Sequence, residues 1–318
     1  MPSQKTPGIP PTTNPPFALN TLRNKRDVSG ELLLDKPVGI TSNAALQIAK
    51  RLYRAAKAGH TGILDPMASG LLPLCLGEAT KFAQYPTDAD KTYEAVIKLG
   101  ETTDTGDADG QLLVQRPVAV SRGDIERVVP QFIGPITQMP PMYSALKHQG
   151  QPLYKYARKG IEIERAARPV TVHEIEILSF TGDTFSIRVD CSKGTYIRVL
   201  AEDIGEMLDC GAHLIGLRRT RVGAFTLASA LTLDKVETLT EVERDTKLLA
   251  PDSLVASLPE ITLEQDAAHY LQQGQAIWLP KLTLHQRFRI YDEKHQFIGV
   301  GEVGDEGKLQ PTRLVVHH

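Results

Sequence analysis

The sequence predicts an α+β protein, in which a mixed sheet forms the main domain and a small β-rich domain follows at the C-terminal end. Two observations favour this class. Period-two strands alternate with segments of helical spacing and with long irregular loops, a pattern typical of a mixed sheet with helices packed on it. In addition, four short strands fall within roughly the last 65 residues, which fits a separately folded β module.

The first predicted elements are a strand and a helix. Glu31–Asp35 is a short apolar strand, ended by a proline and a glycine. Thr41 or Ser42 then caps a helix expected to run to about Ala58, with Gly59 as its end signal. The buried stripe of this helix is expected to contain Ala45, Ile48, Ala49, Leu52 and Ala56.

The later elements follow from the same two periodicities. Alternation in Tyr93–Leu99 and Phe185–Val189 predicts strands with one buried face. Apolar spacing of 3.6 residues predicts helices over Asp124–Phe132 and Val199–Leu208. The four C-terminal strands are expected at Gln275–Leu279, Phe288–Tyr291, Phe297–Glu302 and Arg313–Val316.

These elements divide the chain into three segments. Residues 1–28 contain six prolines and few apolar side chains, so they are expected to be a disordered tail. A weak RNA-tethering role or an organelle transit peptide are the alternatives for that tail. A large α+β domain is expected at 29–252 and the β-rich domain at 253–318.

Composition limits the class of protein. The apolar fraction is 41% and the charged fraction 23%, which are ordinary values for a globular protein. The sequence lacks a signal segment and any apolar run of the roughly 18 residues that a membrane span needs, so we expect a cytoplasmic protein without membrane contact. Cys75, Cys191 and Cys210 are scattered and lie in apolar contexts, which favours packing over disulfides or zinc. Metal-ligand and phosphate-loop spacings are also absent, so no metal or other cofactor is expected.

The net charge of −2 hides local clusters of basic residues. Between Tyr143 and Arg168, basic side chains are interleaved with tyrosines, a combination that suits phosphates and bases of looped RNA. An ordinary exposed hairpin is the alternative, but a second cluster at Arg218–Arg221 favours RNA. The candidates for contact with the RNA backbone are Lys50, Arg54, Lys57, Lys147, Arg158, Lys159, Arg218 and Arg219.

The residue that carries the chemical argument is Asp65. It stands before Pro66 in the Gly-rich loop Gly59–Gly70, and glycines allow a backbone to approach a ligand closely. Local physics alone favours a turn-forming aspartate at such a position.

Four ordered motifs change this interpretation. The segment Gly59-His-Thr-Gly-Ile-Leu-Asp-Pro-Met-Ala-Ser-Gly70 closely resembles the catalytic motif of the TruB family of pseudouridine synthases. Leu33–Pro37, Lys91–Tyr93 and Gly194–Arg198 resemble further motifs of that family, in the same order, and Leu217–Arg219 resembles its downstream substrate-contact segment. The C-terminal module is similar to the PUA-type RNA-binding domain found at the end of these enzymes.

The resemblance implies a reaction and a partner. TruB enzymes isomerise the T-loop uridine at tRNA position 55 to pseudouridine, without a cofactor, after flipping the target nucleotide into the site. It implies that Asp65 is the nucleophile and that Arg198 pairs with it, keeping it ionised. Tyr93 is then expected to stack on the base and to relay the C5 proton. Tyr196 and Leu217 are expected to line the uracil pocket, and His60 to fill the space that the flipped nucleotide leaves.

Several alternatives remain open at this stage. Asp65 could attack C1′, add to C6, or remove the C2′ proton to give a glycal. The protein could also act as a tRNA-folding chaperone, alone or in addition to catalysis. A third possibility is the catalytic subunit of a guide-RNA particle, which the short C-terminal region disfavours. We expect a monomer that binds the T-arm stem-loop, and a 143–168 segment that becomes ordered on RNA.

Overall fold

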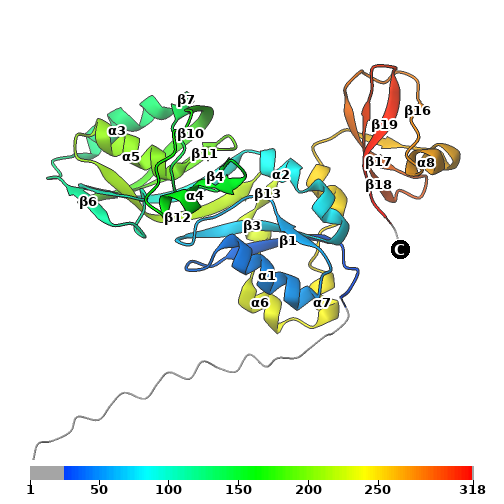
Figure 1. The fold of residues 1–318 in the computed structure, drawn as a ribbon, viewed down its shortest axis with the longest axis horizontal. Coiled ribbons are helices and arrows are strands. Elements are labelled where there is room, and N and C mark those ends of the chain that lie inside the picture. Colours follow the sequence, from blue (N-terminus) through cyan, green and yellow to red (C-terminus); the bar gives the residue numbers. More distant parts are fainter. Residues whose placement is uncertain (1–24, 317–318) are drawn as a thin grey trace, which may run out of the picture.

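The computed structural model of the protein describes residues 25–316. Figure 1 shows a large body built on one long twisted sheet and a smaller C-terminal body with a sheet of its own. Parallel pairing of β1 with β14 and of β3 with β12 occurs beside antiparallel pairs, so the large sheet is mixed. The predicted α+β fold is therefore confirmed.

The large sheet brings together strands from between Gly30 and Thr232. Across the sheet the order is β14 (Leu231–Thr232), β1 (Gly30–Lys36), β3 (Ala68–Leu76), β12 (Ala212–Val222), β4 (Lys91–Leu99), β11 (Thr184–Cys191), β10 (Arg168–Thr181) and β7 (Gly134–Gln138). Two short strands extend it, β2 (Ala58–His60) on β3 and β13 (Phe225–Thr226) on β12. Separate hairpins are formed by β5 (Glu101–Thr103) with β6 (Leu112–Gln115) and by β8 (Lys147–His148) with β9 (Gln151–Pro152).

Helices pack on two parts of this sheet (Figure 1). Near β1 and β3 lie α1 (Ser42–Tyr53), α6 (Leu233–Thr238) and α7 (Glu241–Asp245). Against β4 and β12 lies α5 (Ile197–Met207). The shorter segments are α2 (Gln84–Asp88), α3 (Arg122–Val128), α4 (Leu153–Ala157) and the 3-10 turns η1 (Gly77–Phe82), η2 (Val129–Phe132), η3 (Leu227–Ser229) and η4 (Pro251–Val255). Within residues 25–316, every helix is too short or too polar to span a bilayer.

Most predicted strands and helix starts are confirmed. In β4 the buried positions alternate from Lys91 to Leu99, and in β11 Phe185, Ile187 and Val189 are all fully buried. The hydroxyl of Thr41 accepts from the Ala44 N–H, so the predicted cap of α1 is correct.

The predicted end of the first helix is wrong. The helix ends at Tyr53, because Arg54 adopts a left-handed conformation with φ of 52° and its N–H turns back to the carbonyls of Lys50 and Arg51. Ala58–His60 is instead a strand paired with β3. Lys57 consequently lies outside the helix, and Ala56 is exposed.

The predicted tail overlaps the folded part. Residues 1–24 lie outside the described residues. At the end of the segment, Arg26 forms ion pairs with Glu241 at 3.3 Å and with Asp245, and Val28 is buried. The folded part therefore begins a few residues earlier than the composition suggests.

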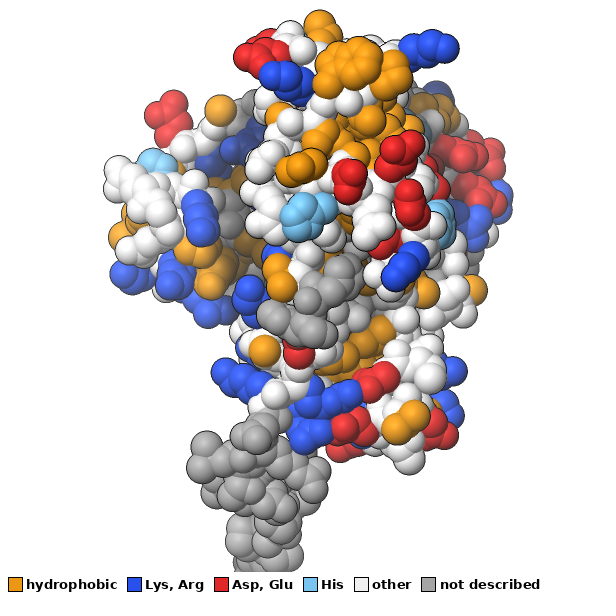
Figure 2. All heavy atoms as spheres, turned by 90° about the vertical axis from the view of Figure 1, so that its right-hand side faces the viewer, with side chains coloured by type: hydrophobic (Ala, Val, Ile, Leu, Met, Phe, Trp, Pro, Cys, Tyr) orange, Lys and Arg blue, Asp and Glu red, His pale blue; other side chains and the backbone are white. Residues whose placement is uncertain are grey.

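The C-terminal body is a five-stranded sheet with one helix. The strands follow the order β15 (Glu260–Thr262), β17 (Arg287–Tyr291), β18 (Phe297–Val303), β19 (Lys308–Leu314) and β16 (Ile277–Trp278), and the helix is α8 (Gln265–Gln272). Three of the four predicted strands correspond to β16, β17 and β18. The fourth is displaced, because β19 begins at Lys308 and ends at Leu314, so Val315 and Val316 lie outside it. Neither α8 nor β15 was predicted. Figure 2 views the molecule from this end and shows basic side chains gathered on one flank and a group of acidic ones on the other.

The two bodies pack directly against each other. The Phe82 ring lies 5.3 Å from that of Phe297, and the Lys81 ammonium donates to the Leu314 carbonyl at 2.8 Å. The apolar cluster around this contact also contains the buried side chains of Cys75, Leu254 and Val300. All three cysteines are free and buried, as the sequence predicts.

Candidate active site

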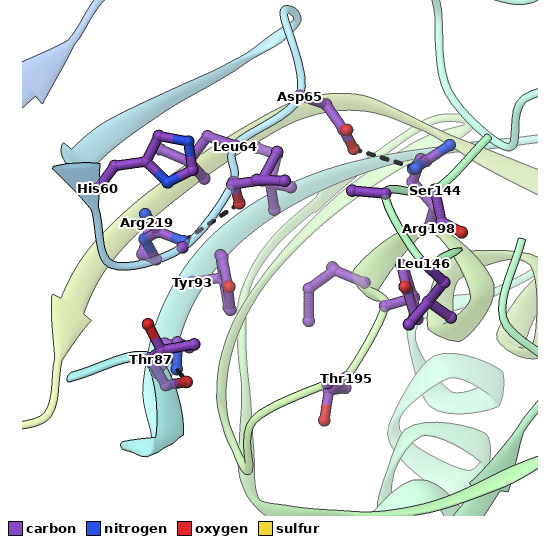
Figure 3. A pocket seen from close by; sticks show the side chains of 18 residues that line it. His60, Leu64, Asp65, Thr87, Tyr93, Ser144, Leu146, Thr195, Arg198 and Arg219 are labelled. Atoms are coloured by element: carbon purple, nitrogen blue, oxygen red, sulfur yellow. Dashed lines mark hydrogen bonds and ion pairs between the residues drawn. The ribbon is translucent and has the colours of Figure 1, made fainter. Parts of the chain in front are cut away.

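A cavity of about 470 Å³ lies over the middle of the large sheet. This volume falls in the range of small-molecule sites, which is roughly 300–1,000 Å³. The lining comes from the loop before β3, from β4 and β12, from the 144–146 segment and from the start of α5 (Figure 3). All of the predicted catalytic and pocket residues line it, namely His60, Asp65, Tyr93, Tyr196, Arg198 and Leu217.

The backbone around Asp65 is held by the first residue of α1 and by the turn before it. The Ser42 hydroxyl donates to the carbonyl of Leu64 at 3.0 Å and accepts from its N–H at 2.8 Å. On the other side of Asp65, the Gly39 N–H donates to the Pro66 carbonyl at 2.8 Å. The backbone on both sides of the carboxylate is thus fixed by a part of the chain more than 20 residues away.

Arg198 faces Asp65 from the first turn of α5. Its Nη2 lies 3.1 Å from Asp65 Oδ2 and donates to the Tyr143 carbonyl at 2.7 Å. Its Nη1 donates to the Thr105 carbonyl at 2.7 Å and lies 3.6 Å from Asp107 Oδ2. The guanidinium is only 5% exposed, so both of its ends are held by oxygen atoms in a buried setting.

The charge on Asp65 depends on opposing effects. Burial raises the pKa of this carboxyl group, the Arg198 guanidinium lowers it, and the carboxylates of Asp107 and Asp109 raise it again. Lys36 contributes a further lowering. The balance of these effects raises the pKa of Asp65 above its ordinary value, while the ion pair with Arg198 favours the ionised form that a nucleophile requires.

Asp107 is a site residue that the sequence reasoning missed. It is 4% exposed and accepts from the Thr105 hydroxyl at 2.6 Å and from the Asp109 N–H at 3.1 Å. The carboxylate therefore fixes the 105–109 turn while it faces Arg198. The dense Asp, Gly and Thr content of residues 103–110 indicates a tight turn, but only the fold shows which cation lies beside it.

Tyr93 and Arg219 lie next to each other on paired strands. They are directly opposite in the β4–β12 ladder, so their side chains point to the same face of the sheet. Burial raises the pKa of the Tyr93 phenol, and the Arg219 guanidinium beside it opposes this rise. Arg219 is 1% exposed and donates to the carbonyls of Leu71 at 2.8 Å and Ile63 at 3.4 Å, so it lies in the cavity rather than on the surface with the other basic candidates.

The remaining pocket residues come from three elements. His60 ends β2, and burial lowers the pKa of its imidazole. Tyr196 caps α5, and its backbone N–H and carbonyl are both held by the Gln138 side chain, at 2.9 and 3.2 Å. Leu217 is paired with Ala68 in the parallel contact between β12 and β3, which places it beside the Asp65 loop.

Two buried lysines also adjoin the cavity. Lys36 has no exposed surface, and its ammonium donates to the carbonyls of Pro37 and Ile40, both at 2.7 Å. Burial lowers its pKa to about 8, although Asp65 opposes the shift. Lys91 lines the cavity and caps the carbonyls at the end of α2, and burial lowers its pKa to about 8 as well. Their bonds to backbone carbonyls indicate structural roles.

The predicted RNA-contact cations, apart from Arg219 in the cavity, differ in their exposure and in their partners within the protein. Arg54 and Arg218 are engaged within the protein, since Arg54 forms an ion pair with Glu241 at 2.5 Å and Arg218 one with Asp35 at 2.7 Å. Lys147, Arg158 and Lys159 are exposed, and no acidic side chain within residues 25–316 forms an ion pair with any of them. Lys57 is exposed and Lys50 is partly buried.

Comparison with known proteins identifies the family. The TruB family pseudouridylate synthase N-terminal domain matches residues 50–197, and two TruB C-terminal domain descriptions match residues 198–258 and 259–315. The tRNA pseudouridine synthase B of Methylobacillus flagellatus is 53% identical over 92% of this chain and 97% of that protein. The chain belongs to the TruB family.

Other relatives agree with this TruB assignment. The tRNA pseudouridine synthase B of Aromatoleum aromaticum is 56% identical over 92% of this chain and 94% of that protein. Among solved structures, a chain of a Cbf5-Nop10-Gar1 complex is 28% identical with a TM-score of 0.68, and covers 91% of this chain and 84% of its own length. A chain of an H/ACA RNP bound to a substrate RNA that contains 2′-deoxyuridine gives a TM-score of 0.69 at 25% identity, over 91% and 85% of the two chains. This TruB protein therefore shares its fold with chains of these two complexes.

Proposed function

We propose that this TruB protein converts the T-loop uridine at tRNA position 55 to pseudouridine, with Asp65 as the nucleophile. The observation that carries the proposal is the Asp65–Arg198 pair, which lies in a cavity shared with Tyr93, Tyr196 and Leu217. Relatives at 50–56% identity carry the name tRNA pseudouridine synthase B, which supports tRNA as the substrate.

The reaction needs one carboxylate and retention of the base. The N1–C1′ bond breaks, the uracil turns while it remains bound, and a C5–C1′ bond forms; the proton on C5 is lost and N1 gains one. Asp65 takes part through its ionised oxygen, by attack on the nucleotide or by stabilising the positive charge that develops at C1′. A glycosidase that hydrolyses the bond uses a second carboxylate to act on water or on the leaving group. Here the second buried carboxylate, Asp107, is directed at Arg198 instead.

The other residues have separate roles in this proposal. Arg198 keeps Asp65 ionised and oriented, because its guanidinium is fixed by two carbonyls and by Asp107. Tyr93 lies against the base and relays the proton from C5. Tyr196 and Leu217 form the apolar sides of the uracil pocket, and His60 occupies the position vacated by the flipped nucleotide.

The RNA surface is proposed from the exposed cations. Lys147, Arg158 and Lys159 lie on the segment that follows Tyr143, whose carbonyl holds Arg198, so RNA bound there would lie near the cavity. We assign the catalytic domain to residues 29–252 and a PUA-like RNA-binding domain to 253–318. The protein acts in this proposal as a monomer in the cytoplasm.

The proposal is tested with purified protein and RNA alone. The protein is incubated with a tRNA transcript and with a T-arm hairpin, in the absence of any guide RNA, and pseudouridine is mapped in both. We expect a single pseudouridine at position 55 in each RNA, and none in a transcript that carries cytidine at that position. A lack of product with both RNAs would overturn the proposed reaction, and product at other positions alone would overturn the proposed site.

A further inference from the structure

The cavity contains buried polar atoms that the protein itself leaves without partners. Seven side-chain nitrogen or oxygen atoms within residues 25–316 are buried and make no hydrogen bond. Three of them line the cavity: His60 Nδ1, Ser144 Oγ and Arg219 Nη2. A buried polar atom without a partner costs stability, so a concentration of such atoms in one cavity points to a ligand that completes their bonds.

Ser144 is the simplest of the three. Its side chain is nine-tenths buried, with the residue 6% exposed, and it stands next to Tyr143, whose carbonyl binds Arg198. Figure 3 shows Ser144 on the Arg198 side of the cavity, away from His60 and Arg219. The Tyr196 phenol, whose pKa is raised by burial and lowered by this hydroxyl, is a neighbour of Ser144 but does not satisfy it.

Arg219 leaves one specific nitrogen unused. Nε donates to the Leu71 carbonyl and Nη1 to the Ile63 carbonyl, which fixes the plane of the guanidinium. Nη2 is buried and meets no acceptor at hydrogen-bonding distance and angle within residues 25–316. The Tyr93 phenol, whose pKa the guanidinium lowers, is its neighbour but does not complete this bond. A guanidinium can only donate, so whatever completes Nη2 must present an acceptor oxygen or nitrogen.

We propose that Ser144 and Arg219 bind the target nucleotide directly, each by donating a hydrogen bond to one of its oxygen atoms. The inference rests on the proposed function, because the occupant of the cavity is taken to be the flipped uridine. Uracil offers carbonyl oxygens at positions 2 and 4, and the adjoining backbone offers phosphate oxygens. These sources share the same acceptor chemistry.

A carbonyl contact to Arg219 would also select the base. If Nη2 donates to the O4 position, cytosine presents an amino group there, and two donors face each other in a buried site. The site would then reject cytidine, because its amino group and Arg219 Nη2 would both be buried donors without an acceptor.

The test uses two variants and a matched control. Ser144→Ala removes only an unpartnered hydroxyl, so the melting temperature of the free protein stays the same or rises. Its kcat/KM falls about 3- to 10-fold, as expected for one lost hydrogen bond between neutral groups. Arg219→Lys cannot reproduce three directed N–H groups, and its kcat/KM falls about 10- to 100-fold.

Ser121→Ala is the control for Ser144→Ala. Ser121 caps α3, and its hydroxyl accepts from the Asp124 N–H, so the same substitution removes a satisfied group away from the cavity. The control lowers the melting temperature and leaves kcat/KM unchanged. Ser144→Ala is expected to do the reverse, lowering kcat/KM without lowering the melting temperature. This result would show that the hydroxyl of Ser144 has its hydrogen-bond partner in the substrate.

The source of each acceptor is found with modified RNA. T-arm hairpins carry 2-thiouridine or 4-thiouridine at the target position, or a methylphosphonate on either side of it. One of the four RNAs lacks the oxygen that accepts from the substituted residue, and on that RNA the wild type and the variant have equal kcat/KM. On the other three RNAs the variant remains less active than the wild type by the same factor as on unmodified RNA. One such RNA is expected for Ser144 and one for Arg219.

Two results would overturn the inference. Ser144→Ala and Arg219→Lys with wild-type kcat/KM on unmodified RNA would exclude direct contacts, and so would reduced activity that none of the modified RNAs equalises. Both results require a wild-type protein that forms pseudouridine, so they are distinct from a failure of the proposed function, in which the wild type forms none.

Discussion

The surroundings of Arg198 and those of Arg219 differ in how completely the protein satisfies a buried guanidinium. Arg198 faces two carbonyls and two carboxylates, so its position is fixed before any substrate arrives. Arg219 has two carbonyl partners and a free Nη2, and His60 nearby also has an unpartnered nitrogen. One side of the cavity is thus preorganised around Asp65, and the other is left open for a ligand.

The largest effect is expected on the preorganised side. Arg198→Lys replaces a fork that binds four oxygens by a single ammonium, which cannot hold Asp65 and the two carbonyls together. We expect kcat to fall about 10²- to 10³-fold, the scale seen when one preorganised electrostatic group is removed. Single-turnover kinetics measure this directly. A variant with nearly wild-type kcat would show that the pair with Asp65 is dispensable.

Asp107→Asn is expected to have a smaller effect of a different kind. The Asp107 carboxylate raises the pKa of Asp65, so its removal lowers that pKa and moves the acid limb of the pH–rate profile to lower pH. The Arg198 guanidinium also loses one anchor, and we expect kcat to fall about tenfold with little change in KM. An unshifted acid limb would separate Asp107 from the charge on Asp65.

The exposed cations Lys147, Arg158 and Lys159 do not line the cavity. They should therefore affect the binding of tRNA and leave the chemical step unchanged. Lys147→Gln and Lys159→Gln are each expected to raise the Kd for tRNA a few-fold, and to reduce the salt dependence of binding by about one phosphate contact. Arg54→Gln is the control, because Arg54 already pairs with Glu241. If all three substitutions raised the Kd equally, cations paired within the protein would contribute to tRNA binding as much as exposed, unpaired ones, which would contradict this account.

Glu31 has a buried, unpartnered oxygen atom but lies outside the cavity. Its substitution should therefore change the stability of the protein and leave its activity unchanged. Glu31 has no exposed surface, its Oε1 is unpartnered, and burial raises its pKa to about 8. The unfolded chain ionises near the ordinary value while the folded protein does not, so this residue reduces stability as pH rises from about 4.5 to about 8. Below that window both states are protonated and the effect vanishes.

Glu31→Gln removes this dependence. The variant should match the wild type in free energy of unfolding at pH 4 and exceed it at pH 8, by a few kcal/mol (about 1.4 kcal/mol for each pH unit of pKa shift). Activity at pH 7 should not change. Denaturant unfolding at the two pH values measures the first point, and a wild-type stability that does not decline relative to the variant would contradict it.

Much of the fold follows from the sequence, because local periodicity determines it. Alternation correctly gave the buried face of β4, and the hydroxyl of Thr41 correctly marked the start of α1. The end of α1 was missed because it depends on a left-handed Arg54 held by contacts with distant parts of the chain. Motif resemblance proposed Asp65 and Arg198, which the fold brings to 3.1 Å.

The rest of the site depends on distant pairings. The role of Asp107 could not be predicted, because its turn contacts Arg198 only in the folded protein. Thr105, in the same turn, is 93 residues from Arg198 in the sequence. The burial of Arg219 was accessible in principle, since neighbours on a strand face opposite sides and Leu217 shares its face. The adjacent Arg218 concealed this, because three basic residues in four positions suggest a uniform surface cluster.

Asp65→Asn tests the central claim most directly. The substitution preserves size and removes the charge that Arg198 faces in this structure. We predict that the variant binds the T-arm hairpin with a Kd within about threefold of wild type, and forms pseudouridine at least about 10³-fold more slowly in a single turnover. Pseudouridine formation at a wild-type rate by this variant would contradict Asp65 as the nucleophile.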